Sequence, residues 1–421
     1  MNNINFVPEG GEEVQDDDLV AVYGEQEAEP DDIAELAGNR DDFKPWHHPV
    51  KQIVRSRQWA KLTKKLIDDR PEGAPRVLRY FTLPGPDLLD VRVLADICQP
   101  KDVKIEYFGF DAGNAPSGKD PSVEDTVAHA GGTSTTAESA LRQAGRITSD
   151  AVILPDRLED IALPESQAAI QLSHRTTFDV INIDACDHLA YCPKGRAHNT
   201  FDALRALLRH QIRATTPWLL FVTTRVEPDL LGQPGIVFQD AITQNLRIPD
   251  SKFGPALADC LEADGAKLAA ELANIWSTHD ARFLRLYSVG LGKFLLQFFH
   301  AQPNLPANVE LASAYAYRVH GANPDMLALA FRITPDALRV FEPNVGGAAV
   351  VPGLEPTRAS YVATQARKLQ DLDEALETKE DIRNEAVSGT KNLLQSANYS
   401  IAAWCNWISN HEYRPMKVEY S

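Results

Sequence analysis

Long apolar runs are absent from this sequence of 421 residues, and cysteine and methionine are scarce, with five and three residues. No segment approaches the roughly 20 apolar residues that are needed to cross a bilayer, and the acidic, polar N-terminus is the reverse of a signal peptide. The cysteines show no paired spacing, which fits a reducing compartment better than a disulfide framework. We therefore expect a cytoplasmic protein that does not contact a membrane.

The signatures of several common enzyme classes are also missing. The sequence contains no phosphate-binding P-loop, no Gly-x-Ser-x-Gly elbow and no His-Glu-x-x-His pair. It lacks Gly-x-Gly-x-x-Gly as well, the phosphate-binding turn of dinucleotide-dependent oxidoreductases. These absences weigh against the hydrolases that depend on such motifs and against a nicotinamide-dependent oxidoreductase.

Basic residues are almost missing from the first 43 positions, which hold 14 acids and one base, Arg40. The net charge of this segment is −13, so the remaining 378 residues carry only −4 of the total of −17. High charge with few aromatic residues predicts a disordered acidic tail over 1–43. The total charge therefore describes a tail, and it excludes little about the partners of the near-neutral body.

Acids are in turn missing from residues 44–65, which contain seven bases. Apolar residues recur there at helical spacing, so we expect a basic amphipathic helix within 44–70, clearest over 50–68. Two interpretations remain open: the bases contact a nucleic acid or a protein partner, or the helix packs on the body with its bases in water. A helix this short favours packing. The bases are Lys44, Lys51, Arg55, Arg57, Lys61, Lys64 and Lys65.

Strand and helix patterns alternate between residues 71 and 335. Five runs rich in β-branched and aromatic residues alternate with helical patterns, which predicts an α/β fold with a doubly wound, mostly parallel sheet. Two further runs, 310–318 and 326–333, are joined by a short turn and predict an antiparallel β-hairpin. The five strands are expected at 76–83, 104–111, 151–154, 178–183 and 218–224.

Helices are expected to fill most of the remaining chain, apart from a loop over 113–135, which is rich in turn-forming residues. Residues 336–421 predict a mostly helical C-terminal extension. The other expected boundaries are a helical insertion over 237–300 with its clearest helix at 256–276, a charged helix at 361–385, and a docking helix at 391–410 that carries Trp404 and Trp407.

Polar residues stand where the predicted strands end, which is where open α/β sheets bind their ligands. Asp111 ends the second strand and Asp156 follows the third, while the fourth strand ends in Asp184, Asp187 and His188. An ionised carboxylate can accept hydrogen bonds from both hydroxyls of a ribose, and histidine exchanges protons near neutral pH. Solvated turns, a surface ion pair and helix caps are the structural alternatives for these residues.

Five βα strands followed by an antiparallel hairpin resemble the class I S-adenosylmethionine-dependent methyltransferase superfamily, over about residues 76–335. The resemblance implies an S-adenosylmethionine cofactor and methyl transfer to an acceptor that the sequence does not identify. It implies that Asp111 binds the ribose, Asp156 the adenine amino group, and that Asp184 lies near the methionine moiety. The loop that follows the first strand would contact the cofactor through Thr82, Leu83, Pro84 and Gly85.

The resemblance also implies an acceptor side of the site, formed by Asp184, Asp187 and His188, with Asp187 or His188 as a general base. The Asx-Pro-Pro-aromatic signature of amino-methylating nucleic-acid enzymes is missing there. The first loop has one glycine where the family expects several, and its two prolines remove backbone donors. The alternative is therefore a catalytically degenerate methyltransferase-fold protein that acts as a binding or assembly subunit.

A zinc site is the remaining hypothesis for the polar cluster after the fourth strand. Cys186, His188, Cys192 and His198 lie within thirteen residues. No pair of them has the short Cys-x2–4-Cys spacing of a structural zinc site. We therefore expect no bound metal.

Overall fold

The computed structural model describes residues 40–111, 130–185, 187–302, 305–336 and 354–411, together with Met416. The expected acidic tail, except its last four residues, lies outside this part of the chain, as does Cys186. None of the described helices is long and apolar enough to cross a membrane.

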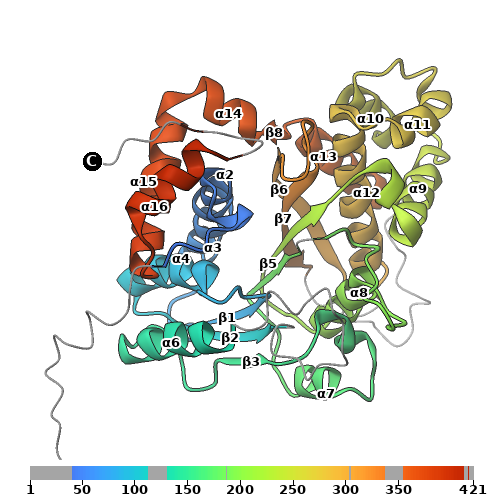
Figure 1. Ribbon diagram of the computed structural model, residues 1–421. Helices are drawn as coiled ribbons and strands as arrows, with labels where there is room; N and C mark the ends of the chain where they lie inside the picture. Colours follow the sequence, from blue (N-terminus) through green and yellow to red (C-terminus); the bar gives the residue numbers. More distant parts are fainter. Residues whose placement is uncertain are drawn as a thin grey trace, which may run out of the picture.

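One sheet of eight strands forms the centre of the molecule, in the order β3-β2-β1-β4-β5-β7-β6-β8 (Figure 1). Neighbours from β3 to β5 pair in parallel, β7 runs antiparallel to both β5 and β6, and β8 is parallel to β6. The α/β fold, the mostly parallel sheet and the hairpin are as predicted. The strands are β1 (Val77–Thr82), β2 (Lys104–Phe110), β3 (Val152–Leu154), β4 (Val180–Asp184), β5 (Trp218–Arg225), β6 (Ala307–Tyr317), β7 (Met326–Pro335) and β8 (Gln370–Asp371).

Helices cover both faces of the sheet, because its central strands carry apolar side chains on both sides. One face is covered by α2 (Pro49–Ile53), η3 (Val54–Ala60), α3 (Lys61–Asp68), α4 (Leu89–Cys98), α6 (Ala130–Gln143), α14 (Leu372–Thr378) and α15 (Glu380–Ser396). The other is covered by η6 (Leu158–Ala162), α7 (Gln167–Ser173), α8 (Thr200–Gln211), α9 (Gly232–Leu246), α10 (Phe253–Leu261), α11 (Leu268–Ser277), α12 (Ala281–His300) and α13 (Leu354–Ala366). The chain also forms α16 (Ile401–Ser409) and the short turns η2 (Pro45–His47), η4 (Gln99–Lys101) and η7 (Pro228–Leu230).

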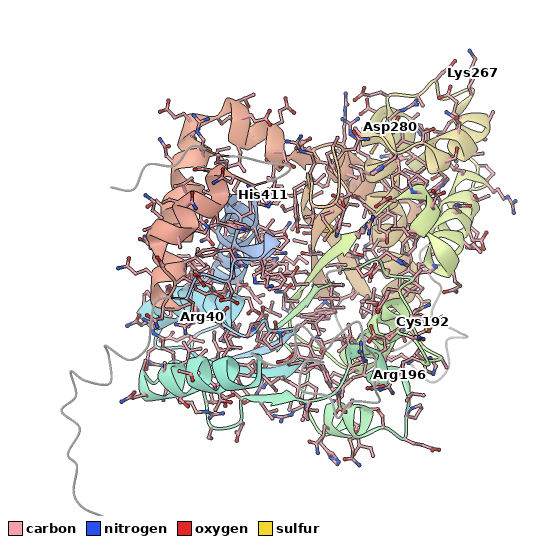
Figure 2. All side chains as sticks on the ribbon, viewed as in Figure 1. Arg40, Cys192, Arg196, Lys267, Asp280 and His411 are labelled. Atoms are coloured by element: carbon pink, nitrogen blue, oxygen red, sulfur yellow. The ribbon has the colours of Figure 1, made fainter. Side chains whose placement is uncertain are left out.

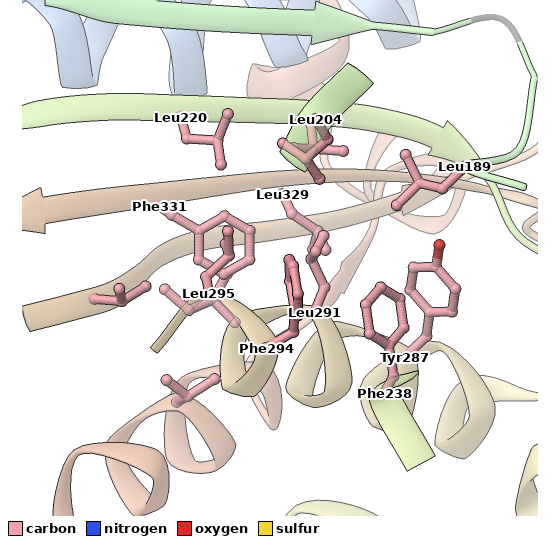
Figure 3. Close-up of a cluster of buried hydrophobic side chains, with 14 of the residues drawn as sticks. Leu189, Leu204, Leu220, Phe238, Tyr287, Leu291, Phe294, Leu295, Leu329 and Phe331 are labelled. Carbon is pink, nitrogen blue, oxygen red and sulfur yellow. The ribbon is translucent and has the colours of Figure 1, made fainter. Parts of the chain in front are cut away.

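The larger apolar core lies between the sheet and α12. Leu291 and Leu295 of α12 face Leu329 and Phe331 of β7, and Phe238 of α9 closes the cluster (Figure 3). All five side chains are fully buried. This core belongs to the half of the molecule opposite the N-terminal helix and holds the antiparallel hairpin against the parallel strands.

The predicted basic helix exists as α2, η3 and α3 in one continuous run, and its middle part, η3, is π-helical. It packs on the sheet, with Trp59 stacked on Phe221 of β5 at 6.3 Å between ring centroids. The expectation that its bases lie in water is wrong for two of them. Lys51 and Arg55 are each only 4% exposed, whereas Lys61, Lys64 and Lys65 are exposed.

Several of the expected helix and loop boundaries are wrong for local reasons. The helix expected over 256–276 is interrupted because Glu262 adopts a left-handed conformation (φ 54°) that ends α10. The one expected over 361–385 is divided because residues 370–371 pair with β6, after which the Asp371 side chain caps α14. The loop expected over 113–135 ends early, since α6 begins at Ala130; residues 112–129 lie outside the described part.

The docking helix expected over 391–410 is divided, because α15 ends at Ser396 and Asn398 adopts a left-handed conformation (φ 62°). Its second part is α16, which attaches the C-terminal extension to the N-terminal segment. Trp404 is fully buried, and its indole Nε1 donates a hydrogen bond to the His47 carbonyl oxygen at 3.0 Å. His47 itself is buried beside Tyr399, with 4.8 Å between ring centroids. The two ends of the described chain therefore form one unit on this side of the sheet.

Acid should weaken this unit through His47. Burial, reinforced by the cations Arg55, Arg40 and Lys44, lowers the pKa of the imidazole to about 3. An unfolded histidine has a pKa of about 6.5, so the unfolded chain takes up a proton that the folded chain refuses, and stability falls as pH drops through this window. Between neutral pH and about pH 5 we expect His47 to cost about 2 kcal/mol of unfolding free energy.

Urea unfolding of the wild type and of His47→Gln at both pH values measures this contribution. The variant keeps an acceptor for the Lys44 backbone N–H, which donates to His47 Nδ1 at 3.1 Å, but it has no group that titrates here. The wild type should lose about 2 kcal/mol more than the variant on acidification. Equal losses would contradict this account of His47.

Candidate functional site

A cavity of about 580 Å³ lies at the carboxyl ends of β1, β2, β3 and β4. This volume is within the range of small-molecule sites, roughly 300–1,000 Å³. The N-terminal helix covers it through Lys51, Arg55 and Trp59, and the turn between β6 and β7 borders it with His320. The cavity is therefore formed by the sheet edge, the N-terminal helix and the hairpin together.

The structure gathers most of the predicted site residues around this cavity. Thr82 is fully buried beneath it, and His188 is outside the lining. The predicted residues that line it are Leu83, Pro84, Gly85, Asp111, Asp156, Asp184 and Asp187.

The loop after β1 is held from below by a buried hydrogen-bond network. Thr82 Oγ1 and Tyr80 Oη both donate to Asp90 Oδ2 in the first turn of α4, and Asn182 Nδ2 of β4 donates to Tyr80 Oη at 2.9 Å. Burial raises the pKa of the Asp90 carboxyl, although the hydrogen bonds from Thr82 and Tyr80 oppose the shift. Thr82 thus supports the floor of the cavity instead of facing a ligand.

The same loop rests on β2 at Gly109. A Cβ atom at Gly109 would lie 2.9 Å from Pro84 Cδ and 3.2 Å from the Thr82 carbonyl oxygen, whereas a Cβ at Gly85 would meet no atom within 4 Å. Pro84 therefore packs directly on the strand that ends in Asp111. Gly85 is exposed and leaves the backbone open at the cavity.

Gly109→Ala should push this loop away from β2. Because the clash involves a proline ring and backbone, we expect a loss of about 1–3 kcal/mol in unfolding free energy. Gly85→Ala is the matched control, with an expected change within about 0.5 kcal/mol. Chemical denaturation of both variants measures the difference, and an equally mild effect of both would show that Pro84 does not pack on β2.

The loop after β1 is also held on its outer side, by contacts of Asp87 with Tyr399 and Arg40. Asp87 accepts a hydrogen bond from Tyr399 Oη at 2.7 Å and pairs with Arg40, whose guanidinium lies 4.4 Å from the centroid of the Tyr399 ring. Figure 2 shows Arg40 between α4 and the C-terminal helices. The C-terminal extension thereby positions the loop that would contact a cofactor.

Lys51 and Asp184 form an ion pair between the N-terminal helix and the end of β4. Lys51 Nζ lies 2.5 Å from Asp184 Oδ1, 3.4 Å from Tyr317 Oη and 4.9 Å from the centroid of the Trp59 ring. Burial by itself would lower the pKa of Lys51, but Asp184 and Tyr317 raise it above its ordinary value. Lys51 is therefore a buried, charged and fully partnered lysine.

A histidine in the turn after β6 has a geometry suited to proton transfer. His320 lines the cavity, and its Nδ1 donates to Asp325 Oδ2 at 2.6 Å. Asp325 is oriented in turn by the backbone N–H groups of Val319 and His320. A carboxylate on Nδ1 leaves Nε2 as the basic nitrogen of the ring.

Asp187 and His188, the two candidates for a general base from the sequence, lie differently with respect to the cavity. Asp187 lines the cavity and accepts a hydrogen bond from the His188 backbone N–H at 2.8 Å. His188 Nε2 lies 3.6 Å from Asp187 Oδ1, and its Nδ1 is enclosed with no hydrogen-bond partner. Asp187 is therefore placed to face a ligand, and His188 is placed behind it.

Three of the four residues that suggested zinc, His188, Cys192 and His198, are described by the structure. The Cys192 thiol donates hydrogen bonds to the carbonyl oxygens of Arg196 and His198, at 3.2 and 3.3 Å. Figure 2 labels Cys192 and Arg196. Within the described ranges, no three His, Cys, Asp or Glu side chains form a group that could hold a metal ion. Cys186 is outside those ranges.

A protein-family model described as PP_RS20740-like matches residues 40–409. The chain belongs to this family. The match covers the sheet, the N-terminal helix and the C-terminal extension, so these parts make up one family unit. No curated protein matches the chain.

Negative charge dominates the cavity of this PP_RS20740-like chain. Among the described residues its lining includes seven carboxylates, against Lys51, Arg55 and Arg157. Burial raises the pKa of Asp156, assisted by Asp160, and burial also raises that of Glu159. The seven acids are Asp87, Asp90, Asp111, Asp156, Glu159, Asp184 and Asp187.

Sequence reasoning missed the cavity residues that come from outside the parallel strands. The sequence predicts that Lys51 and Arg55 contact a partner or lie in water, not that they line a cavity, and the turn that holds His320 predicts only the hairpin. Lys51, Arg55 and Trp59 recur every four residues along α2 and η3, which was a usable signal, since a basic side chain beside an apolar stripe is positioned to reach over a sheet edge. Asp325, five residues after His320, had no distinguishing pattern.

Proposed function

We propose that this protein is a methyltransferase-like protein that uses S-adenosylmethionine to methylate an acceptor still to be identified. The observation that carries the proposal is the cavity at the carboxyl ends of the parallel strands. It brings together Asp111, Asp156 and Asp184, the three acids that the resemblance assigns to ribose, adenine and methionine. A backbone hydrogen bond from Asp111 N to the Leu154 carbonyl oxygen, 3.1 Å long, fixes Asp111 at the tip of β2.

The strand order supports the same proposal. The parallel strands β1 to β5 are continued by an antiparallel hairpin in which β7 lies between β5 and β6. A sheet that ends in such a hairpin is the feature on which the resemblance to class I methyltransferases rests. The usual strand order of a dinucleotide-binding sheet does not include such a hairpin.

The charge of the cavity suits this cofactor. S-adenosylmethionine carries a sulfonium and an ammonium group, and an acidic, partly desolvated cavity favours cations. The cofactor supplies an activated methyl group, and the protein's part is to align the acceptor and, where the acceptor must lose a proton, to accept it. Asp187 and His320 are the residues placed to accept a proton.

A second function has one specific observation in its favour. Pro84 and Pro86 both line the cavity and lack a backbone N–H, so the loop offers a ligand fewer donors than a glycine-rich loop does. This supports a protein that binds the cofactor, or the acceptor, without turnover and acts as an assembly subunit. Turnover separates the two functions.

A ligand panel followed by a turnover assay tests the proposal. We expect S-adenosylmethionine and S-adenosylhomocysteine to raise the melting temperature of the full chain, and nicotinamide dinucleotides to leave it unchanged. Conversion of S-adenosylmethionine to S-adenosylhomocysteine in cell extract that exceeds the conversion by the extract alone, detected by mass spectrometry, would support the enzyme. Binding without any conversion would favour the assembly subunit, and no shift with either adenosyl ligand would reject both.

A further inference from the structure

Arg55 is a buried base of the N-terminal helix, and its charge has no direct partner in the described part of the chain. It is 4% exposed and lines the cavity. Its Nε is enclosed without a hydrogen-bond partner, and its charge is affected only by burial and by longer-range charges, with no side-chain hydrogen bond to a described residue. A buried charge without a partner costs several kcal/mol, so its retention needs a reason.

Lys51, one turn earlier in the same helix, has the carboxylate partner that Arg55 lacks within the described ranges. Lys51 has Asp184 at 2.5 Å, and its pKa is raised. Burial lowers the pKa of Arg55, and the more distant carboxylates Asp184 and Asp90 do not offset this effect. Among the described residues, a carboxylate therefore contacts Lys51 directly, whereas Arg55 has carboxylates only at longer range.

The local backbone also singles out this position. Arg55 lies in η3, the π-helical part of the N-terminal helix, and such segments occur frequently at functional sites. Trp59, in the same segment, also lines the cavity and has an enclosed indole Nε1 without an acceptor. Two unsatisfied donors thus come from one short segment that covers the cavity.

We propose that Arg55 binds a carboxylate or phosphate group of a second ligand, which occupies the side of the cavity next to the hairpin. A guanidinium presents a planar pair of donors that matches either oxyanion. Asp111 and Asp156 follow β2 and β3 at one end of the sheet, whereas Tyr317 and His320 come from the hairpin. The inference rests on the proposed function in one respect: the second ligand is the methyl acceptor, which would then be an anionic molecule.

Thermal unfolding of the full chain with inorganic phosphate as the probe tests the site without any cofactor. We expect phosphate, compared with chloride at equal ionic strength, to raise the melting temperature of the wild type by about 2 °C more than that of Arg55→Met. Without phosphate, Arg55→Met should be as stable as the wild type or more stable, because an unpartnered buried charge has been removed. Arg57→Gln, on the same helix but in a surface pair with Glu385, should respond like the wild type.

The outcomes separate this inference from the proposed function. An equal response of wild type and Arg55→Met to phosphate overturns it, and so does a lower melting temperature of Arg55→Met without phosphate. Arg55→Lys keeps the charge but loses the planar pair of donors, and it should bind phosphate more weakly than the wild type. A response that depends on Arg55, in a protein that does not bind S-adenosylhomocysteine, would support the anion site and reject the methyltransferase.

A comparison of two adenosyl ligands identifies the source of the anion. S-adenosylhomocysteine has an amino-acid carboxylate, and 5′-methylthioadenosine lacks it. We expect Arg55→Met to change the affinities for both by less than threefold, about 0.6 kcal/mol. A selective loss of S-adenosylhomocysteine binding of tenfold or more would assign Arg55 to the cofactor and overturn its assignment to a second ligand.

Discussion

Replacing Asp184 by alanine is expected to destabilise the folded protein by about 3 kcal/mol, apart from any effect on activity. Among the described residues, the substitution leaves Lys51 Nζ in the interior with Tyr317 Oη at 3.4 Å and the rings of Trp59 and Tyr317, none of which is an anion. Taking away one partner of a buried pair costs far more than the pair contributes, because the remaining charge stays desolvated. Urea unfolding at neutral pH measures the loss.

A double-mutant cycle shows whether the ion pair causes this loss. In the background of Lys51→Met the same Asp184→Ala change should cost less than about 1 kcal/mol, since the cation that Asp184 contacts directly has been removed. Glu385→Ala, which breaks the exposed pair with Arg57, is the surface control and should cost at most about 1 kcal/mol. A large cost of Asp184→Ala that persists without Lys51 would mean that Asp184 acts through another contact.

The second large effect is expected at Asp111, on ligand binding. If the carboxylate accepts hydrogen bonds from both ribose hydroxyls, Asp111→Ala should weaken S-adenosylhomocysteine binding by about 3 kcal/mol, roughly 100-fold. The melting temperature without ligand should change little, because Asp111 is half-buried at the strand end. Asp150→Ala, an exposed acid ahead of β3, provides the control for the loss of one negative charge.

Affinity measured by equilibrium dialysis for the three proteins decides the role of Asp111. We expect the wild type and Asp150→Ala to bind alike and Asp111→Ala to bind far more weakly. If Asp111→Ala binds as well as the wild type, this acid does not contact a ribose. The ligand would then lie elsewhere in the cavity.

The sequence predicted the sheet well because its signals are local. Apolar runs such as 178–183 and 218–224 are typical of strands buried on both faces, and the short turn before Met326 favours an antiparallel pair. The carboxyl ends of these strands then meet at one edge. Asp111, Asp156 and Asp184 could therefore be placed near one another without coordinates.

The cover of the cavity could not be predicted in the same way, because it depends on contacts between distant segments. The helical period identifies which side of α2 and η3 is apolar, but not what this side packs against. Lys51 meets Asp184 across 133 positions, and Tyr399 meets Asp87 across 312. The buried state of Arg55 follows only from that docking.

Local exceptions explain the remaining errors in the helices. Non-glycine residues rarely adopt positive φ, so nothing in the sequence pointed to Glu262 as the end of α10. The two residues that pair with β6 and divide the charged region, Gln370 and Asp371, are poor strand formers, and their neighbours determine their conformation.

Calorimetric titration of S-adenosylhomocysteine into the full chain tests the central claim most directly. The account predicts one binding site per chain with a dissociation constant in the micromolar range, and loss of detectable heat in Asp111→Ala at the same concentrations. A titration without heat for the wild type at millimolar ligand, at two temperatures so that a vanishing enthalpy cannot hide binding, would contradict it. The cavity would then belong to a different ligand.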